Sequence, residues 1–324
     1  MRAVQVTSLD GPRALEVRDI EEPGAEGPFG PQVLVEAKAV GVSWPDLLLT
    51  KGEYQMKPEL PFTLGVDYAG VIRSAPDGSG FSPGDRVAGV LGNGAGCEIV
   101  ATGTENVFPL PDAMSFAQGA AIPMNYLTAH FALKERAGLA EGETVLVNGA
   151  SGGVGTATIQ VAKGLGARVI ALTSTDEKAS FAKDAGADEA ILVDGFRDRV
   201  KELTDGRGVD VLLDVVGGDL FTDSLRSLAP QGRLLVVGFT GGEIPQVKVN
   251  RLLLNNVDVR GVGWGAYAMV REGYMRSQWD DLVPMMESGV IDPPIGSTYA
   301  LEQFSEALVE MDERKTLGKS ILEV

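Results

Sequence analysis

The pattern of apolar and polar residues divides the chain into two parts that predict different structures. Before Ser115, short runs of alternating apolar and polar residues are bounded by glycine and proline, as in strands joined by tight turns. The predicted strands are Ala3–Thr7, Leu15–Asp19, Val33–Val40, Asp67–Arg73, Arg86–Val90 and Cys97–Ala101. Several short strands with this spacing favour a β-barrel or a β-sandwich.

After Ser115 the pattern becomes an alternation of helices and short apolar strands. Ser115 and Gln118 form a capping box that predicts a helix running toward Arg136. The strands predicted beyond it are Thr144–Asn148, Arg168–Leu172, Ala190–Val193, Val209–Asp214, Arg233–Val237 and Val257–Gly261, and the helices between them include Gly153–Leu165, Glu177–Ala185 and Asp219–Leu228. This alternation predicts a parallel sheet with helices on both faces. A helix over Glu302–Asp312 and a strand over Lys319–Val324 are expected to follow.

Composition narrows the classes of protein to which the chain can belong. Its 324 residues are enough for about two domains. It has no apolar run long enough to span a membrane, and we expect no signal peptide. The single cysteine, Cys97, excludes an intramolecular disulfide and agrees with a cytoplasmic location. A net charge of −17 repels phosphate backbones, so nucleic acid is a poor candidate partner.

Cysteine and histidine, the commonest ligands of zinc, occur once each, as Cys97 and His130. A structural zinc site needs about four such ligands, and a catalytic site needs about three protein ligands. One chain therefore cannot form a Cys/His zinc site, whereas an all-carboxylate magnesium site stays open. We expect Cys97 to be a small buried residue and His130 to be a neutral structural residue with a backbone partner.

The strongest chemical signal is a glycine-rich turn between a predicted strand and a predicted helix. The apolar strand Val145–Val147 leads into a turn that runs from Gly149 to Gly155, and a helix follows. Glycines permit a tight turn and let the backbone approach a diphosphate, while the helix N-terminus offers unpaired N–H groups. Strand, turn and helix in this order predict a dinucleotide site, although a structural turn without a ligand is the alternative. The residues expected to hold the diphosphate are Ala150, Ser151, Gly152, Gly153 and Val154.

The end of the second strand in this alternation favours NADPH over NADH. Sites that prefer NAD carry an acid at this position, whereas this strand ends in Thr173 and Ser174. Their hydroxyls and the ammonium of Lys178 could accept the 2′-phosphate, which Asp176 would oppose. Alternatively, Ser174 and Glu177 form a capping box and Lys178 is a solvated lysine.

Several motifs taken together resemble the medium-chain dehydrogenase/reductase superfamily, and within it the zinc-independent quinone oxidoreductases related to zeta-crystallin. In chain order, the motifs are Gly41–Asp46, Gly65–Val71, Phe81–Val87, Tyr126–Ala129, the glycine turn, Gly206–Asp210 and Gly263–Tyr267. The resemblance covers nearly the whole chain, and the joint order of the motifs is far more specific than any one of them.

The resemblance implies an α/β fold in which a GroES-like β-barrel domain is interrupted by a Rossmann domain with a doubly wound parallel sheet. We therefore expect residues 1–123 and 266–324 to form the GroES-like domain and residues 124–265 the Rossmann domain, with the active site between them. Zinc-dependent relatives carry a cysteine ligand where this chain has Ser43 and a histidine where it has Val66. Without a Lewis acid, reduction of a quinone or of an activated C=C bond is easier than oxidation of an alcohol.

The resemblance also gives three catalytic candidates. Tyr54 aligns with a tyrosine that lines the family's substrate site, where it could bond to the acceptor oxygen, donate a proton or simply pack. Asp46 aligns with an aspartate near the nicotinamide, and it could orient its neighbours or anchor its loop. Ser43 stands where many quinone reductases have asparagine, and Leu48 stands where tyrosine is frequent, so a more apolar site is expected.

Further cofactor candidates come from the resemblance and from the rule that ligands bind at the carboxyl ends of parallel strands. They are Thr128, Val216, Gly217, Val237, Gly238, Phe239, Gly263, Trp264 and Lys319. The alternatives are that the hydroxyl of Thr128 bonds to its own helix, that Trp264 is a core residue and that Lys319 is solvated.

The sequence thus predicts a zinc-free, NADPH-dependent oxidoreductase that transfers a hydride to a quinone or another conjugated carbonyl acceptor. An enoyl-thioester or alkenal double-bond reductase uses the same chemistry and stays open, as does a non-catalytic, crystallin-like protein that binds NADPH. We expect neither nucleic acid nor a membrane as partner. The resemblance also implies a homodimer joined through the outer strand Val257–Gly261, whose exposed edge would otherwise invite association.

Overall fold

Two compact units make up the chain in the computed structural model, which describes residues 1–28 and 30–324. The first unit comprises Met1–Met124, Glu272–Trp279 and Pro293–Val324, and the second comprises Asn125–Arg271 and Asp280–Asp292. Each unit has its own main sheet and its own core of buried apolar side chains. Among the described residues, none of the helices is both long and apolar enough to cross a bilayer.

The first unit is built mostly from antiparallel strands. A seven-stranded sheet has the order β10-β8-β7-β5-β18-β17, with β9 paired to β5, and a three-stranded sheet has the order β2-β1-β6. The larger sheet contains β5 (Val33–Gly41), β7 (Asp67–Ser74), β8 (Arg86–Val90), β9 (Ile99–Thr102), β10 (Val107–Pro109), β17 (Ile295–Ala300) and β18 (Lys319–Glu323). The smaller sheet contains β1 (Arg2–Val6), β2 (Leu15–Asp19) and β6 (Phe62–Thr63), and the short strands β3 (Glu26–Gly27) and β4 (Gly30–Pro31) pair with each other.

The last strand of the chain joins this unit at its centre. Strand β18 pairs antiparallel with β5, with Ile321 opposite Gly41. Helices α1 (Trp44–Thr50) and α11 (Phe304–Asp312) pack on the same core, to which they contribute Leu47 and Phe304. The pairing places the start of β18 beside the end of β5, where several of the predicted site residues lie.

The helix predicted from Ser115 toward Arg136 is wrong as one continuous element. The capping box of Ser115 and Gln118 is present, but it begins only α2 (Phe116–Ala121). A second helix, α3 (Pro123–His130), starts at the proline and continues as a π-helix, η3 (Phe131–Ala137). The break has a physical cause, because Pro123 has no N–H to donate to the carbonyl four residues earlier.

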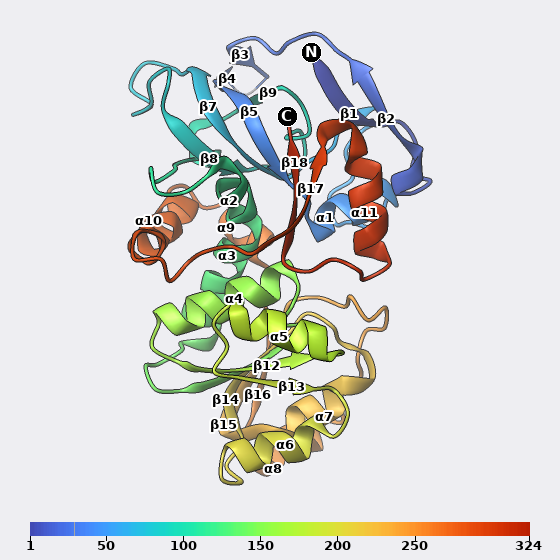
Figure 1. Cartoon of the computed structure of the whole chain (residues 1–324), viewed down its shortest axis with the longest axis vertical. Coiled ribbons are helices and arrows are strands. Elements are labelled where there is room, and N and C mark those ends of the chain that lie inside the picture. Colours follow the sequence, from blue (N-terminus) through green and yellow to red (C-terminus); the bar gives the residue numbers. More distant parts are fainter. Residues whose placement is uncertain (29) are drawn as a thin grey trace. The chain divides into compact units, whose positions relative to one another are not determined.

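The second unit contains a six-stranded parallel sheet in the order β13-β12-β11-β14-β15-β16. The strands are β11 (Thr144–Asn148), β12 (Arg168–Thr173), β13 (Glu189–Leu192), β14 (Val209–Asp214), β15 (Leu228–Val236) and β16 (Asp258–Gly261). The helices are α4 (Gly153–Gly164), α5 (Asp176–Asp184), α6 (Phe196–Leu203), α7 (Phe221–Arg226), α8 (Asn250–Asn255) and α9 (Trp264–Ala268). Figure 1 shows α4 and α5 over one face of the sheet and α6, α7 and α8 over the other.

The strand order of this sheet reverses its direction between β11 and β14. In open parallel sheets, such a reversal leaves a crevice at the carboxyl ends of the two strands, and this is where ligands bind. Strands β11 and β14 are the two central strands, and their middle residues Leu146 and Leu212 are fully buried. The topology therefore places the candidate cofactor site at the turns that follow these two strands.

Candidate active site

The glycine turn after β11 has a backbone that needs glycine at two positions. Gly149 has a φ of +73°, a region in which residues with a side chain are strained. A Cβ atom on Gly155 would lie 2.2 Å from the carbonyl oxygen of Gly149 and 2.7 Å from the Cα of Ala150. Helix α4 therefore packs directly against the turn that precedes it, with no room for a methyl group between them.

The N-terminus of α4 is open toward a ligand. Gly152 caps the helix with a φ of −87° and a ψ of 174°, and no side chain bonds to the first turn. Helix geometry leaves the N–H groups of residues 153–155 without an acceptor inside the helix, and no acidic residue lies in the first turn. A Cβ atom on Gly152 would meet one atom within 4 Å, the oxygen of Gly149 at 3.6 Å. The turn thus combines free donors, a positive dipole end and space, and it fits a diphosphate.

The turns after the neighbouring strands meet at this corner. A Cβ atom on Gly149 would lie 3.2 Å from the side chain of Val216, and one on Gly217 would lie 3.0 Å from the ring of Phe239. Asp214, at the end of β14, fixes the second turn because its Oδ1 accepts hydrogen bonds from the N–H groups of Val216 (2.9 Å) and Gly217 (3.0 Å). The structure therefore brings these predicted residues together at the carboxyl ends of β11, β14 and β15.

Two more of the predicted residues at these strand ends, Val237 and Gly238, directly follow β15. The N–H of Val237 donates to the carbonyl of Asp214 at 2.9 Å, and a Cβ atom on Gly238 would be 3.6 Å from the oxygen of Val215. Asp214 itself was not predicted from the sequence. Asp214 fixes the turn by accepting from the N–H groups two and three residues later, and an aspartate in a sequence does not show such bonds.

Asn125, Thr128 and Ser151 are largely buried residues whose side chains make no hydrogen bond within residues 1–28 and 30–324. Thr128 and Ser151 were predicted, and Asn125 was not. The alternative that the hydroxyl of Thr128 bonds to its own helix is wrong, since no such bond forms. A Cβ atom on Gly153 would lie 2.4 Å from the Nδ2 of Asn125, so this amide lies directly against the turn. None of these three side chains is among those with a fully enclosed, unpaired polar atom, so their polar atoms are accessible and can bond to a ligand.

The end of β12 presents hydroxyl groups and no carboxylate. Thr173 is buried, and its hydroxyl donates to the carbonyl of Thr175 at 3.3 Å. Thr175 caps α5 by accepting a hydrogen bond from the N–H of Lys178 at 3.3 Å. The alternative capping box of Ser174 and Glu177 is therefore wrong by one residue, and Ser174 is exposed at the tip.

The last two candidates of the second unit differ in exposure. Gly263 is exposed and precedes α9, whereas Trp264, the first residue of that helix, is only 3% exposed. The burial of its indole supports the alternative in which Trp264 is a core residue.

In the first unit, the structure brings Ser43 and Asp46 together at the start of α1. The N–H of Ser43 donates to the Oδ2 of Asp46 at 2.8 Å, and the N–H of Gly65 donates to its Oδ1 at 3.2 Å. Asp46 thus anchors both the helix start and the Gly65 loop. Burial raises the pKa of Asp46 to about 8; the charge of Asp67 adds to this, while the two N–H groups and the ammonium of Lys319 oppose it.

Lys319 and Asp67 form a buried ion pair beside Ser43. The Nζ of Lys319 lies 2.5 Å from the Oδ2 of Asp67 and 2.5 Å from the Oγ of Ser43. Ser43 Oγ donates to the same Oδ2 at 2.8 Å, and the N–H of Met124 donates to the other oxygen of Asp67 at 2.8 Å. Lys319 is 4% exposed and Asp67 is 0% exposed, so the alternative of a solvated lysine is wrong. Asp67 was missed because a carboxylate inside a strand carries no signal of its distant partner.

Tyr54 is half-buried and, like Trp44, packs against the core cluster that contains Leu47 and Phe304. Its hydroxyl makes no hydrogen bond to any other residue that the structure describes. Burial, and then the negative charge of Asp46, raise the pKa of Tyr54 above its usual value. The phenol is therefore protonated at neutral pH and can act as a hydrogen-bond donor.

His130 and Cys97 are both buried. The Nε2 of His130 lies 3.1 Å from the Oδ2 of Asp281, which also accepts from Lys134 at 2.6 Å, a side-chain partner that the sequence did not predict. Burial lowers the pKa of His130 and raises that of Cys97 to about 12. Among the described residues, no group of three His, Cys, Asp or Glu side chains could hold a metal ion.

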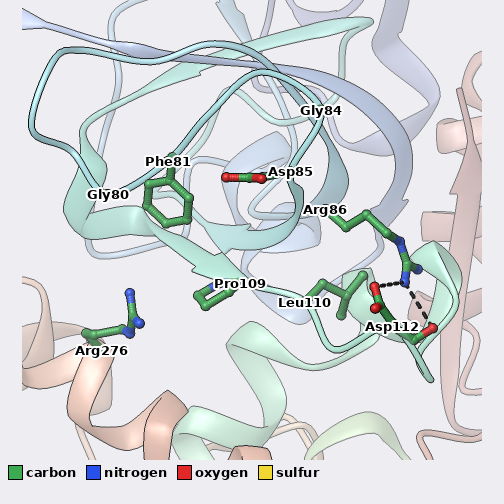
Figure 2. Close-up of a pocket in the computed structure, with 9 residues that line it drawn as sticks. All are labelled: Gly80, Phe81, Gly84, Asp85, Arg86, Pro109, Leu110, Asp112 and Arg276. Carbon is green, nitrogen blue, oxygen red and sulfur yellow. Dashed lines mark hydrogen bonds and ion pairs between the residues drawn. The ribbon is translucent and has the colours of Figure 1, made fainter.

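A cavity of about 480 Å³ in the first unit is separate from these residues (Figure 2). None of the predicted site residues lines it. Arg86, on its wall, is already bonded to the carbonyls of Pro111, Asp112 and Met114. We therefore do not assign the reaction to this cavity.

The fold and the open glycine turn define a dinucleotide-binding protein with a second, antiparallel unit. Comparisons with known proteins agree: residues 30–134 match the family described as "Alcohol dehydrogenase GroES-like domain", and residues 153–288 match "Zinc-binding dehydrogenase". The second description applies to the family as a whole, since this chain has Ser43 and Val66 at the positions compared with zinc ligands above.

Individual relatives are similar over their full lengths. The mouse "Quinone oxidoreductase-like protein 2" is 38% identical over 326 residues, which cover 99% of this chain and 91% of that protein. The structure of Escherichia coli quinone oxidoreductase, described as complexed with NADPH, matches with a TM-score of 0.90 and 28% identity over 100% of both chains. A mycobacterial protein, also described as complexed with NADPH, matches with a TM-score of 0.90 and 33% identity over 100% of both chains.

The chain therefore belongs to the quinone oxidoreductase-like branch of the medium-chain dehydrogenase/reductase superfamily, and it is an enzyme of that branch. The predicted fold class, a GroES-like β-barrel domain plus a Rossmann domain, is confirmed.

Proposed function

We propose that the chain is an NADPH-dependent oxidoreductase that reduces a quinone or another conjugated carbonyl compound without a metal ion. The observation that carries the proposal is the open N-terminus of α4 at the Gly149–Gly155 turn, with the amide of Asn125 directly against it. Two similar structures are described as complexes with NADPH, which supports the same cofactor here. The cytoplasmic location expected from the single cysteine stays a prediction.

Each part of the chain has a definite task in this proposal. When bound, NADPH supplies a hydride, which carries two electrons, to an electron-poor carbon of the acceptor. The backbone of residues 150–154 holds the diphosphate, and the polar side chains beside it orient the rest of the cofactor. Negative charge gathers on the acceptor oxygen as the hydride arrives, and the protonated hydroxyl of Tyr54 can stabilise that charge by donating a hydrogen bond.

A panel of acceptors tests the proposal. Purified protein is mixed with 1,4-benzoquinone, an alkenal or crotonyl-CoA, each with NADPH and with NADH, and oxidation of the cofactor is followed by its absorbance. Fastest oxidation of NADPH with the quinone is expected. Preference for the alkenal or the thioester would favour a double-bond reductase instead. No oxidation with any acceptor, together with tight NADPH binding, would favour the crystallin-like, non-catalytic alternative.

Selectivity for NADPH is assigned to the tip of β12, where Thr173 and Ser174 lie without a carboxylate and Lys178 follows in the first turn of α5. An acid placed at this tip should repel the 2′-phosphate and leave NADH binding unchanged. Ser174→Asp is expected to raise the Kd for NADPH about tenfold, which is about 1.4 kcal/mol. Ser180→Asp adds the same charge to an exposed position on α5 and serves as the control. Equal weakening of NADPH by both variants would contradict the assignment.

A second copy of the chain is the partner proposed for the edge of the parallel sheet. Strand β16 is an outer strand, so one row of its backbone groups has no neighbour in the sheet. Helix α8, which leads into β16, exposes Leu253 (76%) and Leu254 (74%) to solvent. Exposed apolar side chains in the helix that precedes an outer strand favour an interface.

The oligomeric state tests this proposal directly. Light scattering of the purified protein at micromolar concentration is expected to give the mass of a dimer. Leu253→Asp should shift the mass toward the monomer, because a charge would be buried in the interface. Leu192→Asp introduces the same charge on β13, at the opposite edge of the sheet, and should leave the dimer intact. A monomeric mass for the unmodified protein would refute the proposal.

A further inference from the structure

The side chain of Lys319 is fixed in one position inside the first unit. A Cβ atom on Gly41 would lie 2.7 Å from the Cε of Lys319 and 2.2 Å from the carbonyl oxygen of Ala120. The lysine stem therefore runs through a passage that exists only because residue 41 is glycine. Together with 4% exposure, this leaves the ammonium little freedom to move.

The hydrogen bonds of this ammonium are incomplete. A lysine ammonium has three N–H donors. Two of them point to acceptors, the Oδ2 of Asp67 and the Oγ of Ser43, each at 2.5 Å. The third has no acceptor among residues 1–28 and 30–324. Since a buried charged donor without an acceptor is costly, the arrangement has the form of a site built for one more oxygen atom.

Ser43 cannot supply a donor to a substrate while this network is intact. Its hydroxyl hydrogen is directed to Asp67 at 2.8 Å, and its oxygen accepts from Lys319. Apart from the buried hydroxyl of Ser320, which makes no hydrogen bond to the described residues, the unused donors among the residues named above are the third N–H of Lys319 and the hydroxyl of Tyr54. Both groups interact electrostatically with the same carboxylate, that of Asp46, so they belong to one neighbourhood.

We propose that Lys319 is a catalytic residue whose third N–H donates to the carbonyl oxygen of the acceptor, with Asp67 as the positioning residue that holds the ammonium in place. The proposal rests on the proposed function and names its electrostatic centre. A hydride, with its two electrons, forms a new C–H bond at the acceptor carbon while the electrons of the conjugated C=O bond move to oxygen. The resulting phenolate or enolate oxygen lies against the ammonium and then takes one proton from solvent, which completes the reduced product. A fixed cation in a buried site stabilises this oxyanion far more than one in water.

The first test needs neither the cofactor nor turnover. The compound 4-nitrophenol is an aromatic oxygen acid whose anion is yellow, so its ionisation on the protein can be followed by absorbance. A neighbouring ammonium should lower the pKa of the bound phenol by roughly one to three units relative to water. In Lys319→Met the lowering should vanish. An equal pKa of the bound phenol in both proteins, or no binding to the unmodified protein, would overturn the proposal.

The second test uses the reaction. A series of 1,4-benzoquinones with electron-donating and electron-withdrawing substituents is reduced with NADPH. Lys319→Met should lower kcat/KM about a hundredfold, and it should make the rate depend more steeply on electron withdrawal, because the acceptor must then stabilise its own charge. The Kd for NADPH, measured by fluorescence, should stay unchanged. A raised Kd with an unchanged slope would show that Lys319 binds the cofactor and would overturn the proposal.

Two further variants keep the tests decisive if Lys319→Met folds poorly. The double variant Lys319→Met with Asp67→Asn removes both charges, so no carboxylate is left buried alone. It should fold and show the same steep slope and the same loss of phenolate binding. Ser43→Ala keeps the ion pair and should retain the lowered pKa of bound 4-nitrophenol. Failure of the acceptor panel would refute the proposed function, whereas the cofactor-free nitrophenol result judges Lys319 separately.

Discussion

Replacing Gly152 with alanine should weaken NADPH binding while leaving the protein stable, whereas the same change at Gly155 should reduce both. The two glycines lie in the same turn, but their surroundings differ. A methyl group on Gly155 would point into the backbone of the turn itself, and one on Gly152 would point into open space. Comparing the two variants therefore distinguishes a glycine that the fold requires from a glycine that leaves room for a ligand.

The magnitude at Gly155 follows from the atoms that its methyl group would meet. These are the oxygen of Gly149 at 2.2 Å and two backbone atoms of Ala150 at 2.7 and 2.8 Å, none of which can rotate away. Overpacking of this kind costs about 1–3 kcal/mol. Alanine gains about 1 kcal/mol over glycine inside a helix, so the net loss of stability is up to about 2 kcal/mol.

At Gly152 the two effects of alanine on the free energy of unfolding nearly cancel. The nearest atom to the new methyl group is 3.6 Å away, an ordinary contact, and the φ of −87° suits alanine. Alanine is a poorer N-cap than glycine by about half a kcal/mol, but it also restricts the unfolded chain by about the same amount. Stability should stay within about 0.5 kcal/mol of the unmodified protein. A methyl group facing the diphosphate should nevertheless raise the Kd for NADPH at least tenfold, or about 1.4 kcal/mol.

Urea unfolding gives the stabilities, and NADPH fluorescence titration gives the Kd values. Gly24→Ala is the matched control, because its methyl group would meet no atom closer than 3.9 Å and Gly24 lies in the first unit. Gly24→Ala should change neither the stability in urea nor the Kd for NADPH. An unchanged Kd in Gly152→Ala would refute the reasoning, since it would mean that no diphosphate approaches this turn.

Three further predictions concern buried charges. Lys319→Met should cost about 3–5 kcal/mol in urea unfolding because it leaves Asp67 buried and unpaired, and adding Asp67→Asn should recover most of this loss; equal losses in single and double variants would argue against the ion pair. Arg233 makes two parallel 2.7 Å bonds to Glu143 at the amino ends of the strands, so Arg233→Lys should cost about 1–2 kcal/mol without changing the Kd for NADPH. The pKa of Asp46 is raised from 3.8 to about 8, so the folded state holds the proton more tightly and stability should fall as the pH rises between these values. Asp46→Asn should flatten that part of the pH profile, and a steeper profile would contradict the assignment.

Much of the fold could be predicted because its signals are local. Alternation, glycine and proline marked β2, β8, β11 and β14 with the bounds that the structure has. Where local signals conflicted, the prediction was less accurate. Strand β15 begins at Leu228 rather than Arg233, since Pro230 and Gly232 conceal the strand pattern. Helix α10 (Tyr274–Glu287) was not predicted, and it contains Pro284.

Residues of the candidate site could likewise be predicted where their signal is local, and could not where it depends on a distant contact. The glycine turn could be found from the sequence because strand, turn and helix are contiguous, and the structure shows the geometry that this order implies. Asn125 lies against Gly153, yet nothing in a helix sequence marks an asparagine that faces another element. Lys319 and Ser43 are separated by 276 residues along the chain, so their contact depends on the pairing of β18 with β5.

The three ionisable groups around Ser43 form a charge balance that suits a reaction producing an anion. Asp67 neutralises Lys319, and the pKa of Asp46, raised to about 8, keeps that second carboxyl uncharged at neutral pH. If both carboxylates were ionised, the cluster would carry a net negative charge, and an oxyanion on the acceptor would be repelled rather than stabilised. The protonated Asp46 still anchors α1 and the Gly65 loop by accepting their N–H groups. Burying Asp46 therefore keeps the helix start in place without adding a second negative charge beside the ammonium that faces the acceptor oxygen.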